Sequence, residues 1–159
     1  MDPRRPQIKD LARAYFCSEA VLLEKNEEIK EYLNETKSEF PSIHFDVVHV
    51  SVDQENDPRG FKFLVAYAAD ATFIAFRGSR TFEDLGQESQ PASSASDVHG
   101  VVLELSRSFI GSGCKLLAQL CNSGKRIIFC GHRLGGSVAH MVVINFFKDP
   151  GVNVVSLLW

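Results

Sequence analysis

The stretch "IFCGHRLGGSVAH", residues 128–140, joins an apolar segment to a helix-like segment through a glycine-rich turn. Where a strand reverses sharply into a helix, the residues two before and two after the apex lie against neighbouring backbone, so a side chain there would clash. Gly131 and Gly135 occupy those two positions, and Gly136 lets the helix pack closely on the sheet. The segment predicts a buried strand that turns into a helix at Arg133.

The N-terminal part of the chain has helical patterning. Residues 8–16 predict a short helix, and residues 18–38 predict a longer amphipathic helix with Ser18 as a plausible N-cap. We expect this longer helix to cover a sheet; binding of a partner is the alternative. Pro41 ends the helical segment, and the β-branched and aromatic residues of 42–52 predict a strand.

Strands and helices alternate in the rest of the chain. The predicted order from residue 61 onward is strand, strand, helix, strand, helix, strand, at 61–70, 71–78, 101–121, 124–131, 133–149 and 151–159. The first two strands meet in a hairpin at Asp70 and Ala71, and Gly111 and Gly113 are expected to bend or break the helix that contains them. Such alternation predicts an α/β fold with a mostly parallel sheet flanked by helices.

Three sequence marks, in the right order, resemble the class 3 (fungal-lipase-like) lipases of the α/β-hydrolase fold. Residues 131–136 stand where that family has G-H-S-L-G-G, and small residues follow them. Residues 75–79 resemble the family's A-F-R-G-T, with Asp84 beyond, and residues 98–100 keep part of its V-H-x-G-F. The resemblance covers about residues 43–159, after an N-terminal helical segment.

The resemblance implies a role for each matching position. The nucleophilic serine would fall at Arg133, and the oxyanion-hole amides would come from Leu134 and the Gly78–Ser79 loop. The elbow around the apex would consist of Gly131, His132, Gly135 and Gly136. The polar segment 79–97, which is long for a plain connection, would lie where these lipases carry a lid.

The family's catalytic aspartate and histidine come from segments that follow the strand ending at Trp159, so we expect residues 41–159 to form a C-terminally incomplete lipase-like domain. Arginine stays protonated and has no lone pair to offer a carbonyl. Loss of triad members costs of order 10⁴ to 10⁶ in rate in studied proteases. We therefore expect a pseudoenzyme or a fragment of an ester hydrolase.

No other residue is predicted to replace the serine. Ser137 lies one helical turn past the apex, and His140 is expected to be a satisfied or half-buried core histidine. Asp84 and Asp97 have no visible partner base, and the resemblance implies that His99 packs near the oxyanion loop without a catalytic role. Because an elbow apex is a strained backbone position, we expect either a relaxed turn or an Arg133 side chain that enters the old oxyanion pocket and holds an anion.

Composition excludes several classes of protein. The chain has 159 residues, 45% of them hydrophobic, and a net charge of −3, without the clustered basic face that nucleic-acid binding requires. It shows no signal peptide and no apolar run long enough to span a membrane. The four cysteines lack metal-ligand spacing and are expected to be buried thiols in a cytoplasmic protein. No cofactor or metal is expected.

Two further hypotheses concern partners. The remnant pocket or the helix over 18–38 could bind a lipid, an ester or a protein without catalysis. The strand at 151–159 would present an apolar edge, so self-association through that edge is also expected.

Overall fold

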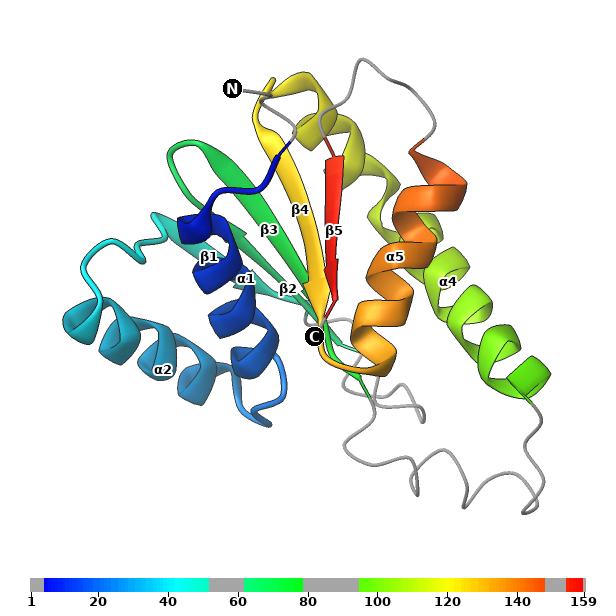
Figure 1. The fold of residues 1–159 in the computed structure, drawn as a ribbon, viewed down its shortest axis with the longest axis horizontal. Helices are drawn as coiled ribbons and strands as arrows, with labels where there is room; N and C mark the ends of the chain where they lie inside the picture. The colour runs from blue at the N-terminus through cyan, green and yellow to red at the C-terminus, as the bar shows by residue number, and fades with distance from the viewer. Residues whose placement is uncertain (1–4, 52–61, 79–94, 148–153, 159) are drawn as a thin grey trace.

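The computed structural model describes residues 5–51, 62–78, 95–147 and 154–158 (Figure 1). In chain order its helices and strands are α1 (Ile8–Ala20), α2 (Asn26–Glu39), β1 (Val47–Val50), β2 (Phe63–Tyr67), β3 (Ala71–Phe76), α4 (Ala95–Asn122), β4 (Arg126–Gly131), α5 (Leu134–Phe146) and β5 (Val154–Leu158). The alternation of strands and helices predicted after residue 61 is confirmed, with boundaries that differ by a few residues.

The five strands form one mixed sheet in the order β1-β2-β3-β4-β5. The first two pairings, β1 with β2 and β2 with β3, are antiparallel, whereas β3 with β4 and β4 with β5 are parallel. The sheet is therefore mixed rather than mostly parallel, because short connections such as the hairpin at Asp70 force antiparallel neighbours. β5 lies at one edge of the sheet, and self-association through that edge stays a prediction.

Helices cover both faces of the sheet (Figure 1). Because side chains alternate along a strand, Phe73 faces one layer while its neighbour Ile74 faces the other. The first layer contains α1 and α2, and the second contains α4 and α5. The α/β class predicted from the sequence is confirmed.

The helix expected over 18–38 is wrong as a single element. The structure continues α1 to Ala20 and starts α2 only at Asn26. Ser18 is not a cap: its side chain is buried within α1 and its hydroxyl donates to the Ala14 carbonyl at 2.8 Å. Val21, between the helices, is fully buried against the sheet. The chain turns there so that both helices reach the same sheet face.

The helix expected over 101–121 is longer and unbroken. α4 has 28 residues and runs through Gly111 and Gly113 without interruption. A Cβ at Gly113 would lie 3.5 Å from the Phe109 ring, an ordinary van der Waals distance, and a Cβ at Gly111 would meet no atom within 4 Å. Among the described residues, no helix is both long and apolar enough to cross a membrane.

An aromatic cluster fills the layer under α4. The rings of Phe76 and Phe109 meet edge to face at 4.8 Å, and the rings of Phe63 and Phe109 do so at 5.0 Å. Phe76 also stacks on Phe129, with ring centroids 6.0 Å apart. Edge-to-face and offset pairs of this kind stabilise a core beyond their buried area. The cluster fixes the end of β3 beside β4, next to the Arg133 turn.

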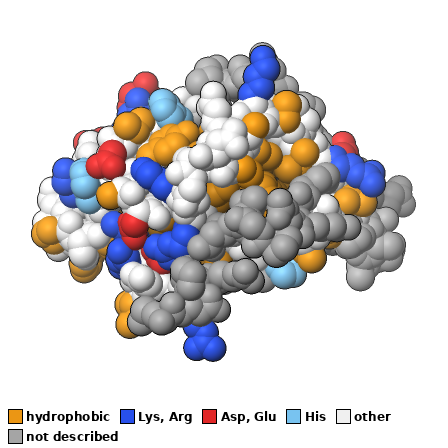
Figure 2. Space-filling model, turned by 90° about the horizontal axis from the view of Figure 1, so that it is seen from above, with side chains coloured by type: hydrophobic (Ala, Val, Ile, Leu, Met, Phe, Trp, Pro, Cys, Tyr) orange, Lys and Arg blue, Asp and Glu red, His pale blue; other side chains and the backbone are white. Residues whose placement is uncertain are grey.

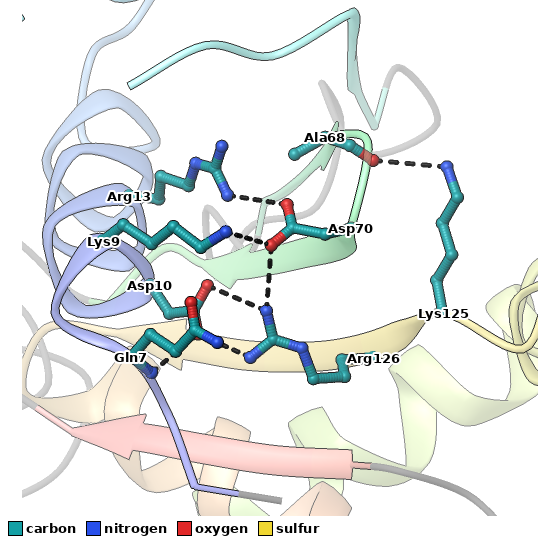
Figure 3. Close-up of polar contacts among 8 residues, drawn as sticks. All are labelled: Gln7, Lys9, Asp10, Arg13, Ala68, Asp70, Lys125 and Arg126. Atoms are coloured by element: carbon teal, nitrogen blue, oxygen red, sulfur yellow. Dashed lines mark hydrogen bonds and ion pairs between the residues drawn. The ribbon is translucent and has the colours of Figure 1, made fainter. Parts of the chain in front are cut away.

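A network of charged side chains ties α1 to the opposite end of the sheet (Figure 3). The Arg126 guanidinium, at the start of β4, contacts Asp10 at 2.5 and 3.2 Å and Asp70 at 3.1 Å. Asp70 also pairs with Lys9 at 2.7 Å and with Arg13 at 2.9 Å. Figure 2 looks down on this end of the sheet and shows acidic and basic side chains side by side in its left half.

Burial makes the network sensitive to the loss of either sign of charge. Asp10 is completely buried and the Arg126 side chain is 14% exposed, so neither charge is well hydrated alone. The hydrogen bond to Asp10 raises the pKa of Arg126. Burial alone would raise the pKa of Asp70, but the hydrogen bonds and charges of Lys9 and Arg13 outweigh it and hold that pKa well below its usual range.

The Asp10→Asn variant tests the importance of the buried pair. It leaves Arg126 charged and poorly hydrated, so we expect the free energy of unfolding to fall by about 3 kcal/mol. Urea denaturation followed by circular dichroism measures this loss. The matched control is Glu35→Gln on the exposed side of α2, which should change stability by less than about 0.5 kcal/mol. Equal effects of the two variants would contradict a stabilising role for the pair.

The Asp70→Asn variant tests the pH dependence of the network. Because folding lowers its pKa, Asp70 stabilises the fold above its unfolded pKa of about 3.9, and this contribution is lost as the pH falls below that value. Its side chain is one-third exposed, so we expect Asp70→Asn to cost only about 1 kcal/mol at about pH 6. Urea denaturation at about pH 6 and about pH 3 should show this difference shrinking in acid; a constant difference would be contrary evidence.

Candidate active site around the Arg133 turn

The turn between β4 and α5 has the close backbone approach predicted from its glycines. A side chain at Gly131 would place its Cβ 2.4 Å from the carbonyl carbon of Gly135 and 2.7 Å from the amide nitrogen of Gly136. A side chain at Gly135 would place its Cβ 2.1 Å from the carbonyl oxygen of Phe76, at the end of β3. Real Cβ atoms do not approach backbone so closely, so the turn requires glycine at both positions.

The segment after β3 closes over the same turn. A Cβ at Gly78 would lie 2.8 Å from the His132 carbonyl oxygen, 3.0 Å from the Gly135 nitrogen and 3.5 Å from the Leu134 nitrogen. The structure therefore brings together the backbones of Gly78 and Leu134, the two positions expected to supply oxyanion-hole amides. Ser79, the third such position, lies outside the described residues, as does most of the expected lid.

Arg133 keeps the strained conformation of an elbow apex. Its φ is 50° and its ψ is −116°, and among the described residues it is the only non-glycine with positive φ. The expectation that the turn has relaxed is wrong, because the glycine contacts on both sides fix the path of the chain. Such strain costs about 1–3 kcal/mol.

The Arg133 side chain is exposed to solvent. No ion pair joins its guanidinium to any other residue in the described part of the chain, so nothing there draws it into an anion pocket. An exposed, permanently protonated group at this apex offers positive charge and hydrogen-bond donors, and no lone pair for nucleophilic attack.

His132 faces away from the apex, toward α1. Its Nε2 atom lies 2.6 Å from a carboxylate oxygen of Glu19, in a contact that lacks hydrogen-bond angles and is an ion pair only when the imidazole is protonated. Its ring meets the Tyr15 ring edge to face at 5.7 Å. Since His132 is only 18% exposed, it serves here as a contact between the turn and α1. Sequence patterning gave no signal for this contact, because it joins segments more than 100 residues apart.

Ser137 and His140, which were considered as a replacement nucleophile or base, make hydrogen bonds to other groups. Ser137 lies one helical turn past the apex, and its hydroxyl donates back to the Arg133 carbonyl at 3.4 Å. His140 is exposed rather than half-buried in the core, and its ring is satisfied by a hydrogen bond of 3.2 Å with Ser156 on β5. Ser137 therefore contacts the apex backbone through a hydrogen bond within one turn of helix, and His140 is directed toward β5.

The cysteines supply no nucleophile near the turn. Cys130 precedes Gly131 in β4, and complete burial raises the pKa of its thiol to about 12, so it stays protonated near neutral pH. Cys17 on α1 is equally buried, and burial likewise raises its pKa. The four cysteines, all of them described, form no disulfide, and Cys114 is exposed rather than buried because it lies on the outer side of α4.

Several candidate residues are not placed beside the turn by the structure. Asp84 lies outside the described residues, and for Asp97 and His99 only the helical backbone at the start of α4 is described. Within the described ranges, no cluster of three or more His, Cys, Asp or Glu side chains could hold a metal ion.

Comparisons with known proteins point to lipases through the fold. No protein-family model and no curated protein matches the chain. A triacylglycerol lipase with a serine-protease-like triad matches at 13% identity and a TM-score of 0.52, over 94% of this chain and 61% of its own. A Rhizomucor miehei lipase propeptide complex, a deletion mutant, matches at 13% identity and a TM-score of 0.53, over 97% of this chain and 52% of its own.

Identities this low establish similarity of fold and nothing about activity. This chain spans between 52% and 61% of the length of those two lipase chains. The structure is therefore a lipase-like α/β fold, a mixed five-stranded sheet with helices on both faces.

The Gly135→Ala variant tests the close approach between β3 and the turn. Its new methyl group would overlap the Phe76 carbonyl oxygen, so we expect a loss of about 3 kcal/mol in the free energy of unfolding. The matched control is Gly111→Ala, at a helical site with no atom within 4 Å of the new Cβ. This control should gain about 0.5–1 kcal/mol. Thermal and urea denaturation of both variants measure these changes. If Gly135→Ala leaves the free energy of unfolding unchanged, β3 and the turn are further apart than the structure shows.

The Arg133→Gly variant tests the strain at the apex. Glycine adopts positive φ without penalty, so the variant should be about 1 kcal/mol more stable than the parent in urea denaturation. Arg133→Ala is the matched control, since it removes the charge, keeps a Cβ and should leave the strain in place. If the two variants are equally stable, the apex is not strained.

Proposed function

We propose that this chain is a class 3 lipase-like domain that does not hydrolyse esters. The observation that carries the proposal is the turn itself: it keeps the glycine contacts and the positive φ of an elbow while its apex is Arg133. The family role of that apex is to expose a nucleophilic oxygen, and a guanidinium has none.

The remaining chemistry of the turn is that of a binding site. The Leu134 amide and the backbone at Gly78 lie close together beside the apex, as oxyanion-hole donors do in the family. With an exposed cation next to them, this end of the sheet would attract an ester carbonyl or a carboxylate without breaking a bond. A lipid or ester ligand is therefore the partner that we propose for this site.

The alternative, a binding module built on one helix over 18–38, has less support. That helix is divided into α1 and α2, and the apolar residues Ile29 and Leu33 of α2 are buried in the core that covers the sheet. A face already packed against the sheet is not available to a partner.

Labelling with a fluorophosphonate probe and hydrolysis of a short-chain ester test the proposal. We expect the parent chain to show no covalent labelling and an activity at least about 10⁴ below that of an active lipase. Arg133→Ser is the matched variant, since it places a hydroxyl at the apex. Labelling of that variant alone would show that Arg133 blocks the chemistry, whereas labelling of the parent would overturn the proposal.

A further inference from the structure

A small hollow lies far from the Arg133 turn, between α2 and the edge strand β1. It has a volume of about 190 Å³. Four residues of α2 line one side, and the segment 45–48 lines the other. Figure 1 shows these two elements together on the side of the molecule opposite α4 and α5.

The charges of α2 are segregated around the helix. At about 100° per residue, Lys30, Asn34 and Lys37 share one face, and this face borders the hollow. Four of the five glutamates of the helix, at positions 28, 31, 35 and 39, lie about 100–180° away from Lys30 around the axis, whereas Glu27 is one turn before Lys30 and about 60° away. Within the described residues, neither Lys30 nor Lys37 makes an ion pair. Two ammonium groups and one amide therefore border the hollow, and neither ammonium group is held in an ion pair by its own helix.

The floor and far wall of the hollow are apolar. Leu33 is 6% exposed, Phe45 and Val48 are half-buried, and Val47 is 47% exposed. At about 30 Å³ per water molecule, the hollow has room for roughly six waters, or an equivalent short aliphatic chain. The site thus combines a cationic rim with an apolar interior of limited length.

One acidic residue opposes this character. Asp46 also lines the hollow, and its carboxylate lies 3.3 Å from Nε2 of His44. Its negative charge would weaken the attraction of any anion to the two lysines. Removal of that charge is therefore expected to tighten the binding of an anion and to leave the binding of a neutral molecule unchanged.

We propose that the hollow between α2 and β1 binds a short-chain aliphatic carboxylate. Its charged end would lie at Lys30 and Lys37, where ammonium groups donate charge-assisted hydrogen bonds, and its chain would lie on Leu33, Phe45 and Val48. The apolar chain distinguishes this ligand from a simple inorganic anion, and a chain of about six carbons would occupy the volume of the hollow.

Titration of the folded, ¹⁵N-labelled chain with hexanoate tests the proposal. We expect saturable amide shifts in α2 and β1, with a Kd in the millimolar range for so small a ligand. Acetate, which has the charge without the chain, and hexanol, which has the chain without the charge, should each bind at least about fivefold more weakly. Raising the salt concentration should weaken hexanoate binding because the lysines are exposed.

Variants separate the site from general charge effects. Lys30→Gln with Lys37→Gln should raise the Kd for hexanoate about tenfold, and Asp46→Asn should lower it about twofold. Lys115→Gln, an exposed lysine on α4, is the matched control and should change nothing. Shifts centred on the Arg133 turn, equal binding of acetate and hexanoate, or an unchanged Kd in the double lysine variant would each overturn the proposal. Fluorophosphonate labelling of the parent chain and of Arg133→Ser tests the proposed function separately, and its result does not depend on hexanoate binding.

Discussion

The close contact between the end of β3 and the β4–α5 turn is the constraint on which the fold depends most. Three glycines meet there: 78, 131 and 135 each have backbone atoms within 3 Å of where a Cβ would stand. Such contacts leave the chain one path from strand to helix. The positive φ of Arg133 follows from that path, whatever side chain stands at the apex. The strain is thus a property of the scaffold, and it persists without a nucleophile to expose.

β4 is held at both of its ends by α1. Near its N-terminus, α1 places Asp10 against Arg126, the first residue of the strand. Near its C-terminus, α1 places Glu19 and Tyr15 against His132, just after the strand ends. The helix therefore spans β4 from its first residue to the turn, so the position of the turn depends on α1 as well as on the sheet. The inner face of α1 is therefore occupied by these contacts with β4 and the turn.

Most of the fold could be predicted from local sequence, and the errors have a common cause. The turn glycines, the apolar strands and the helices after residue 61 carry signals within a few residues of each other. The break between α1 and α2 carries none, because Val21 looks like one more apolar position on a continuous helix and only its burial against the sheet reveals the turn. Likewise Asp10, Asp70 and Arg126 are ordinary charged residues until the sheet brings them together. Both the α1–α2 break and the charged network depend on contacts between segments that are distant in the sequence.

The candidate site shows how much of a scaffold is specified by packing alone. Gly131, Gly135 and Gly78 satisfy packing demands that would exist in an inactive protein as much as in an active one. The apex side chain is exposed, so nothing in the core selects for serine over arginine there. The two lipase structures share 13% sequence identity with this chain. Their similarity therefore reflects a shared packing of the sheet and the turn, and carries no information on activity. Activity depends on side chains that the fold does not dictate, and at Arg133 the apex side chain is a cation without a nucleophilic oxygen.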